Sequence, residues 1–98
     1  MLFYALKYEK RRMCFMKVII KKVNYKRGWA VFEKEDGDFG WFEILDTVDL
    51  EEDDLLQGEF DVLGGVTVLK IATRENVDIF IEDYGMTYKK ALEMVFRQ

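Results

Sequence analysis

Six short runs rich in Val, Ile and aromatic residues, separated by turn signals, most constrain how this chain can fold. Several alternate apolar and polar positions, which is typical of strands with one buried face. Turn signals stand at Gly28, Asp36-Gly37, Gly64-Gly65 and Glu75-Asn76. Since no long connection separates the runs, the pattern favours an antiparallel barrel over βαβ units. The predicted strands are 16–25, 29–34, 39–45, 59–63, 66–72 and 77–82.

A short helix is predicted after the last strand. Gly85 ends the strand pattern, and Thr87 is a good N-cap for a helix over residues 87–97. Tyr88, Leu92 and Val95 follow one another at helical spacing, so the helix has one apolar stripe. A helix this short must dock that stripe on something, and we expect the open end of the barrel to receive it. The predicted fold class is mainly β, a five- to six-stranded antiparallel barrel with a short C-terminal helix.

The chain reads as one domain. It has 98 residues, no proline and no low-complexity tract, so nothing marks a linker. The barrel pattern begins at Met16, and Met13 and Met16 are both plausible alternative starts. We therefore assign residues 16–98 to the barrel domain and residues 1–15 to an N-terminal appendage or extra strand.

Composition argues against most catalytic chemistry. The chain has no histidine and one cysteine, Cys14, which excludes imidazole triads and an intramolecular disulfide. It contains no phosphate loop, zinc spacing or nucleophile motif. We expect a protein that is not an enzyme and needs no cofactor or metal. No apolar run approaches the ~20 residues of a membrane helix, and a lone thiol suits a reducing compartment, so we expect a cytoplasmic protein without membrane contact.

Charge is distributed unevenly along the chain. Residues 1–27 contain nine Lys and Arg and one acid, whereas residues 28–98 contain six Lys and Arg and eighteen acids. Such asymmetry predicts two faces of opposite sign, or a basic arm on an acidic body. The acidic stretch 46–54 lacks the glycine and spacing of a calcium loop, and we interpret it as a solvated loop. A weaker alternative is that the acidic body docks a basic partner.

Part of the sequence resembles a known family. Asn24-Tyr25-Lys26-Arg27-Gly28-Trp29-Ala30-Val31-Phe32 is similar to the end of the first strand and the first aromatic motif of cold-shock domains, and Gly40-Trp41-Phe42-Glu43-Ile44 to their second. Lys22, Val31 and Glu43 stand where the family has Trp, Phe and His. The resemblance implies an OB-like barrel that binds single-stranded RNA or DNA weakly. Trp29 and Trp41 would stack on bases, and the phosphate contacts would come from Lys21, Lys22, Lys26 and Arg27.

A second interpretation needs no nucleic acid. Trp29 and Trp41 could instead be core or rim residues whose indoles are packed locally. In that case the barrel would serve protein interaction or self-association, through exposed apolar strands or the C-terminal helix. The expected partner is then another protein or a second copy of the chain.

Overall fold

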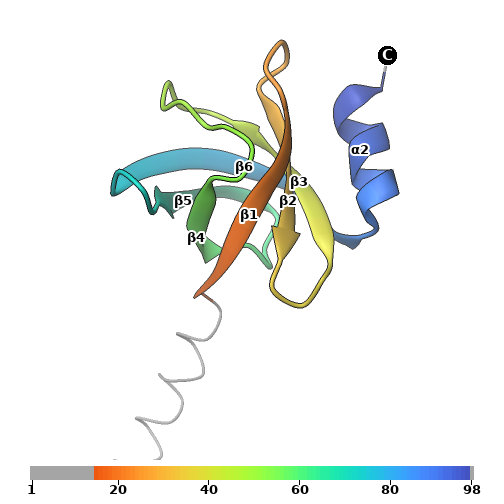
Figure 1. Cartoon of the computed structure of the whole chain (residues 1–98), viewed down its shortest axis with the longest axis horizontal. Helices are drawn as coiled ribbons and strands as arrows, with labels where there is room; N and C mark the ends of the chain where they lie inside the picture. Colours follow the sequence, from red (N-terminus) through yellow and green to blue (C-terminus); the bar gives the residue numbers. More distant parts are fainter. Residues whose placement is uncertain (1–14, 98) are drawn as a thin grey trace, which may run out of the picture.

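The computed structural model describes residues 15–97, which form a closed six-stranded barrel with one helix outside it (Figure 1). Neighbouring strands are antiparallel, and the order around the barrel is β1-β2-β3-β6-β5-β4. The elements are β1 (Phe15–Asn24), β2 (Trp29–Lys34), β3 (Phe39–Ile44), β4 (Leu55–Glu59), β5 (Gly64–Lys70), β6 (Glu75–Met86) and α2 (Tyr88–Phe96).

Two three-stranded meanders, β1-β2-β3 and β4-β5-β6, build the barrel. The long segment between β3 and β4 carries the chain from one meander to the other, and β1 pairs with β4 while β3 pairs with β6. The predicted fold class is thus confirmed, and six strands close where the OB fold has five. The architecture is consistent with an OB-like barrel. The predicted N-terminal appendage, residues 1–15, lies outside the described residues except for Phe15.

The interior follows from the alternation of side chains along the strands. On β2, Ala30 and Phe32 point inward and are fully buried. Phe32 stacks on Phe42 at 5.9 Å between ring centroids and meets Phe60 at 5.0 Å. Gly40 makes room for the Phe32 ring, because a Cβ at Gly40 would lie 2.5 Å from Phe32 Cζ. Full burial of a large apolar side chain is worth about 1.5–3 kcal/mol, so these rings stabilise the barrel strongly.

A buried lysine occupies the barrel end near the β2–β3 turn. Lys34 continues the inward positions of β2, and its side chain is 6% exposed. Its Nζ donates to Asp61 Oδ1 and lies 3.8 Å from Asp36 Oδ2 and 5.3 Å from the centre of the Tyr84 ring. Desolvation lowers the pKa of Lys34, but the hydrogen bond to Asp61 and the nearby carboxylates outweigh it and raise this pKa above 10.5. Lys34 therefore stays charged within the barrel end.

The C-terminal helix forms where the sequence predicts it but docks elsewhere. The Thr87 side chain accepts a hydrogen bond from the Lys90 amide at 3.2 Å, as an N-cap should. The expected position at the open barrel end is wrong, because α2 lies along the outer face of β2 and β3 (Figure 1). No helix within residues 15–97 is long and apolar enough to cross a membrane.

Three strands differ from their predicted bounds by two residues or more, and β1 and β3 differ by one residue. β4 spans 55–59 instead of 59–63, because Leu56 fills the core and Gly58 packs so closely on Val68 that a Cβ there would lie 2.7 Å from it. β5 begins and ends two residues earlier than expected, and the turn that follows it is 71–74. β6 begins two residues earlier than expected and runs to Met86, past Gly85, and its pairing with β3 extends from Ile79 to Met86.

Candidate functional site

Trp29 and Trp41 lie side by side on the outer surface of the barrel. In the β2–β3 register Trp29 is opposite Glu43 and Val31 is opposite Trp41, so the two indoles are diagonal neighbours. Their ring centroids are 5.1 Å apart, and the ring planes are inclined by 54°. The structure thus brings together the aromatic pair that the sequence singled out.

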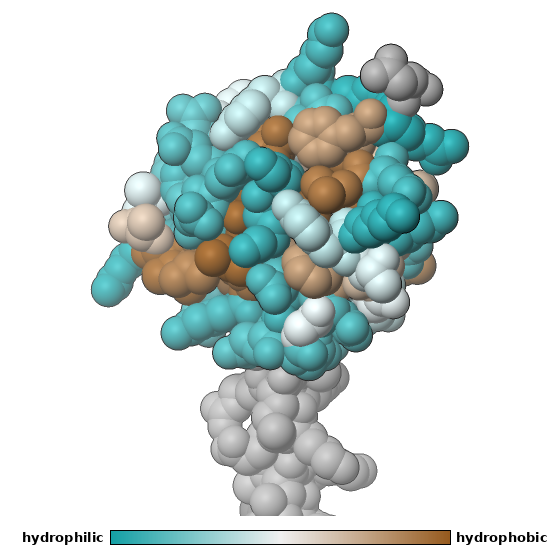
Figure 2. All heavy atoms as spheres, turned by 45° about the vertical axis from the view of Figure 1, so that its right-hand side comes forward, coloured by the Kyte–Doolittle hydropathy of each residue, from teal (hydrophilic) through white to brown (hydrophobic). Residues whose placement is uncertain are grey.

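Helix α2 covers this tryptophan face, which we define as Trp29, Val31, Phe39 and Trp41. Ala91 and Val95 of α2 are fully buried against it. The Asn24 side-chain amide also donates to the Val95 carbonyl at 2.8 Å, which ties the end of the helix to β1. On the side shown in Figure 2, apolar side chains reach the surface in patches interrupted by hydrophilic residues.

The cover leaves little of the aromatic pair accessible. Trp41 is 8% exposed, and Trp29 is half-buried. The Trp41 indole Nε1 is buried with no hydrogen-bond partner among the described residues. An unsatisfied buried donor costs about 1–3 kcal/mol. No base can stack on Trp41 while α2 is docked.

The predicted basic residues do not form one continuous cationic surface. Lys21 occupies a bulge in β1 and lies 3.7 Å from Glu33, whereas Lys22 lies 3.7 Å from Glu52 in the β3–β4 segment. The two lysines therefore pair with acids of different elements. The Arg27 guanidinium lies 4.9 Å from the centre of the Trp29 ring. Lys26 is exposed in the β1–β2 turn.

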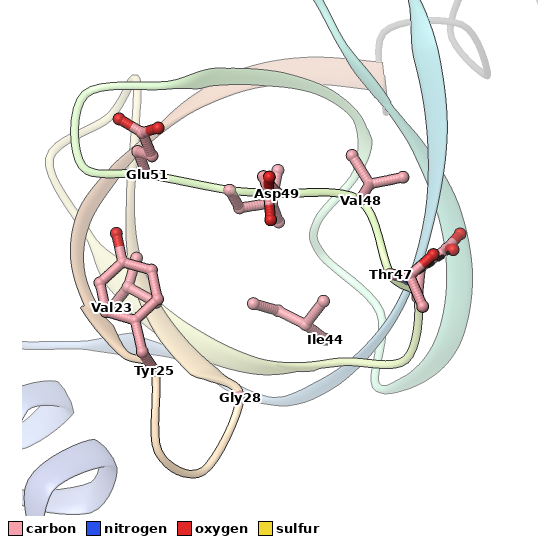
Figure 3. Close-up of a pocket in the computed structure, with 10 residues that line it drawn as sticks. Val23, Tyr25, Gly28, Ile44, Thr47, Val48, Asp49 and Glu51 are labelled. Carbon is pink, nitrogen blue, oxygen red and sulfur yellow. Dashed lines mark hydrogen bonds between the residues drawn. The ribbon is translucent and has the colours of Figure 1, made fainter.

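A pocket of about 470 Å³ opens at one end of the barrel, beside the β1–β2 hairpin (Figure 3). We name it the mouth pocket. Aliphatic side chains from β1, β3 and the β3–β4 segment form its floor, and carboxylates and Tyr25 stand at its rim (Figure 3). Its volume is within the range of ligand pockets, about 300–1,000 Å³. The lining residues are Val23, Tyr25, Gly28, Ile44, Asp46, Thr47, Val48, Asp49, Leu50 and Glu51.

The acidic segment 45–54 is held firmly over the barrel end. Leu50 is 3% exposed and belongs to the core, and Val48 packs against the same core. The backbones of Asp53 and Asp54 exchange hydrogen bonds with Ile20 at 2.7 and 2.9 Å. Lys70 Nζ donates to the Asp49 carbonyl at 2.7 Å. The segment that we expected to be a solvated loop therefore forms one side of the pocket and is fixed to the core. The sequence signal that we missed was the alternation of Val48 and Leu50 with acidic residues.

The mouth pocket is electrically negative. Its rim carries three carboxylates, from Asp46, Asp49 and Glu51, and no Lys or Arg of residues 15–97 lines it. The pKa of Tyr25 is raised above 10.0, by partial desolvation first and then by the negative charges of Glu51 and its acidic neighbours. Residues 15–97 hold eleven Lys and Arg against eighteen acids, a net charge of −7. Long-range attraction at this end therefore favours cations.

The lining of the pocket combines an aliphatic part with a carboxylate part. Within the described part of the chain, no group of three or more potential ligand side chains is placed to hold a metal ion. An aliphatic floor favours an apolar group, and a carboxylate rim favours positive charges beside it. A ligand with both features would satisfy the whole surface.

Comparisons with known proteins add no family. No protein-family model, curated protein or solved structure matches the chain. Functional inference therefore depends on the geometry of the barrel itself.

Proposed function

We propose that this protein is a non-catalytic protein-interaction module that binds a basic segment of a partner protein at the mouth pocket. The observation that carries the proposal is the pairing of an aliphatic floor with three rim carboxylates. No cation from the described part of the chain lines the pocket. The partner segment would place one apolar side chain on the floor and Lys or Arg side chains against the rim.

The physical terms support a binding mode of moderate strength. An apolar side chain that becomes fully buried on the floor gains about 1.5–3 kcal/mol. Exposed ion pairs at the rim add only about 0–1 kcal/mol each, but they raise the association rate and discriminate against acidic partners. Binding at such a site weakens as salt rises, because the Debye length falls to roughly 8 Å at physiological ionic strength.

The nucleic-acid interpretation stays a prediction, and three observations weaken its support. Its stacking surface, the tryptophan face, is covered by α2. Its lysines are partly neutralised, since Lys21 and Lys22 pair with acids. A polyanion would also approach a body with a net charge of −7 over residues 15–97. The protein-interaction alternative requires no rearrangement of the barrel.

Fluorescence anisotropy tests the proposal with three labelled probes. The first is a peptide with one leucine flanked by lysines, the second has glutamates in place of the lysines, and the third is an oligothymidylate. We expect the lysine peptide to bind and the other two to bind at least tenfold more weakly. An oligothymidylate that binds more tightly than the lysine peptide would overturn the proposal.

A charge-reversed variant locates the site. Asp49 and Glu51 line the pocket, and their side chains make no hydrogen bond or ion pair among the described contacts, so Asp49→Lys with Glu51→Lys should leave the fold intact. We expect this variant to bind the lysine peptide about tenfold more weakly, which corresponds to about 1.4 kcal/mol. The matched control, Glu35→Lys with Glu93→Lys, changes two exposed acids outside the pocket and should bind like the wild type. Equal weakening in both variants would contradict the assigned site.

A further inference from the structure

The chain itself contains a segment with the chemistry that the mouth pocket selects. Resting on the proposed function, we propose that residues 1–14 of a second copy occupy the pocket, so that the protein self-associates by exchanging its N-terminal segments. We name residues 1–14 the tail.

Composition makes the tail complementary to the pocket. It carries four Lys and Arg residues and one acid, a net charge of +3, against the −7 of residues 15–97. Apolar and aromatic residues stand between its cations, for example in Leu6-Lys7-Tyr8 and Arg11-Arg12-Met13. An apolar anchor flanked by positive charges is the pattern that an aliphatic floor with a carboxylate rim would bind. The cations of the tail are Lys7, Lys10, Arg11 and Arg12.

The place where the tail joins the barrel determines which copy it can reach. Phe15 starts β1 beside Glu59, whereas the pocket is lined by Val23 near the other end of the same strand. Eight residue steps of strand separate Phe15 from Val23, a distance of about 26 Å. Lys10 is five residues from Phe15, so it reaches at most about 18 Å from the start of β1. The backbone of the cluster Lys10–Arg12 therefore ends short of the Val23 side of its own mouth pocket, which favours the pocket of a second copy for this cluster.

Exchange of tails gives two assemblies that solution measurements can separate. Two copies that each place a tail in the other's pocket form a closed, two-fold dimer. Copies joined head to tail form an open chain that grows with concentration. Both depend on charge, so both dissociate as salt rises.

The decisive experiment mixes two full-length variants and measures mass by sedimentation and light scattering at low salt. The tail variant is Lys10→Glu with Arg11→Glu and Arg12→Glu. The mouth variant is Asp49→Lys with Glu51→Lys. We expect wild type to self-associate, each variant alone to be monomeric, and the equimolar mixture to form a heterodimer, because its reversed tail and reversed pocket are complementary again. Glu35→Lys with Glu93→Lys is the matched control and should self-associate like wild type.

The outcomes distinguish this inference from the proposed function. A wild type that stays monomeric at low salt, variants that still self-associate, or a mixture that stays monomeric would each overturn tail exchange. In those cases, binding of the lysine peptide at the pocket would still support the proposed function. A wild type that does not bind the lysine peptide, together with a mouth variant that still self-associates, would show that the tail binds elsewhere and would overturn both.

Discussion

Replacing Val95 with aspartate should release α2 from the barrel and expose the tryptophan face. Val95 is fully buried and lies in the last turn of the helix. The substitution removes about 1.5–3 kcal/mol of apolar burial. It also places a carboxylate without a partner in a site that excludes water, which costs at least as much again.

The helix has little with which to offset this loss, about 3–6 kcal/mol in total. It is nine residues long and has two buried residues, Ala91 and Val95. A helix of this length is marginal on its own, so release should be accompanied by unfolding of its turns. Release also returns water to the unsatisfied Trp41 N–H, which further favours the open state.

Tryptophan fluorescence measures the release directly, since the chain has two tryptophans and both lie on this face. In Val95→Asp we expect emission to shift to longer wavelength and quenching by acrylamide to increase, while circular dichroism shows loss of helix and retention of strands. The control is Phe96→Asp, the same change at the next residue, whose side chain is 45% exposed. It should keep the wild-type emission.

A milder variant guards against collapse of the whole barrel. Val95→Ala removes part of the apolar contact without adding a charge, so quenching should be intermediate between wild type and Val95→Asp. A folded Val95→Asp protein with the emission and quenching of wild type would refute the inference that α2 protects the indoles.

Four further predictions concern the barrel ends and its core. Asp61→Ala should lower the free energy of unfolding by about 1–3 kcal/mol, because it leaves the Lys34 ammonium without its main partner. Lys34→Met should change the free energy of unfolding by less than about 1 kcal/mol, since Asp61 is half exposed and can be hydrated. Urea titrations that rank the two variants the other way would contradict this. Because the folded pKa of Lys34 is raised above 10.5, its stabilising contribution is complete below that value and is lost as pH rises through the folded pKa. The stability of wild type relative to Lys34→Met, followed by urea titration, should therefore fall as pH rises above 10.5. Gly40→Ala should lower the free energy of unfolding by about 1–3 kcal/mol, because its Cβ would lie 2.5 Å from Phe32 and from the Asp83 carbonyl. Gly65→Ala should lower it by less than about 1 kcal/mol, since the nearest atom would be 4.0 Å away. Equal urea midpoints for the two variants would be evidence against the close approach at Gly40. The pKa of Tyr25, followed by NMR of its labelled ring, should fall in the double variant Asp49→Lys with Glu51→Lys. It should stay unchanged in the control, Glu35→Lys with Glu93→Lys. An unchanged Tyr25 pKa in the first variant would mean that the rim charges do not act on the pocket.

The barrel could be predicted because its strand patterns are local. Val77, Ile79 and Ile81 alternate with Asp78, Phe80 and Glu82 and are the fully buried positions of β6. Gly37 has a positive φ in the β2–β3 turn, which explains why Asp36-Gly37 marks that turn. The predicted turns at Gly64-Gly65 and Glu75-Asn76 are wrong, because these residues begin β5 and β6. β4 was misplaced because Leu55–Gly58 has no clear alternation and its register depends on pairing with β1.

The position of the helix and the pocket depended on contacts that no local pattern specifies. One signal for the helix was present, since Trp29-Ala30-Val31-Phe32 is apolar at four consecutive positions and a strand of that kind is covered on both faces. The pocket required knowing that Val48 and Leu50 fold inward from an acidic segment. Pairing of Lys21 with Glu33 likewise arises from a bulge that the sequence does not mark.

An NMR titration of the labelled full-length chain tests the central claim, that the mouth pocket and not the tryptophan face receives the ligand. The lysine peptide should shift the amides of Gly28, Val48 and Leu50 and leave the indole N–H signals of Trp29 and Trp41 in place, and oligothymidylate should shift neither set at physiological salt. Indole signals that move with oligothymidylate while the mouth amides stay unchanged under the peptide would contradict the account.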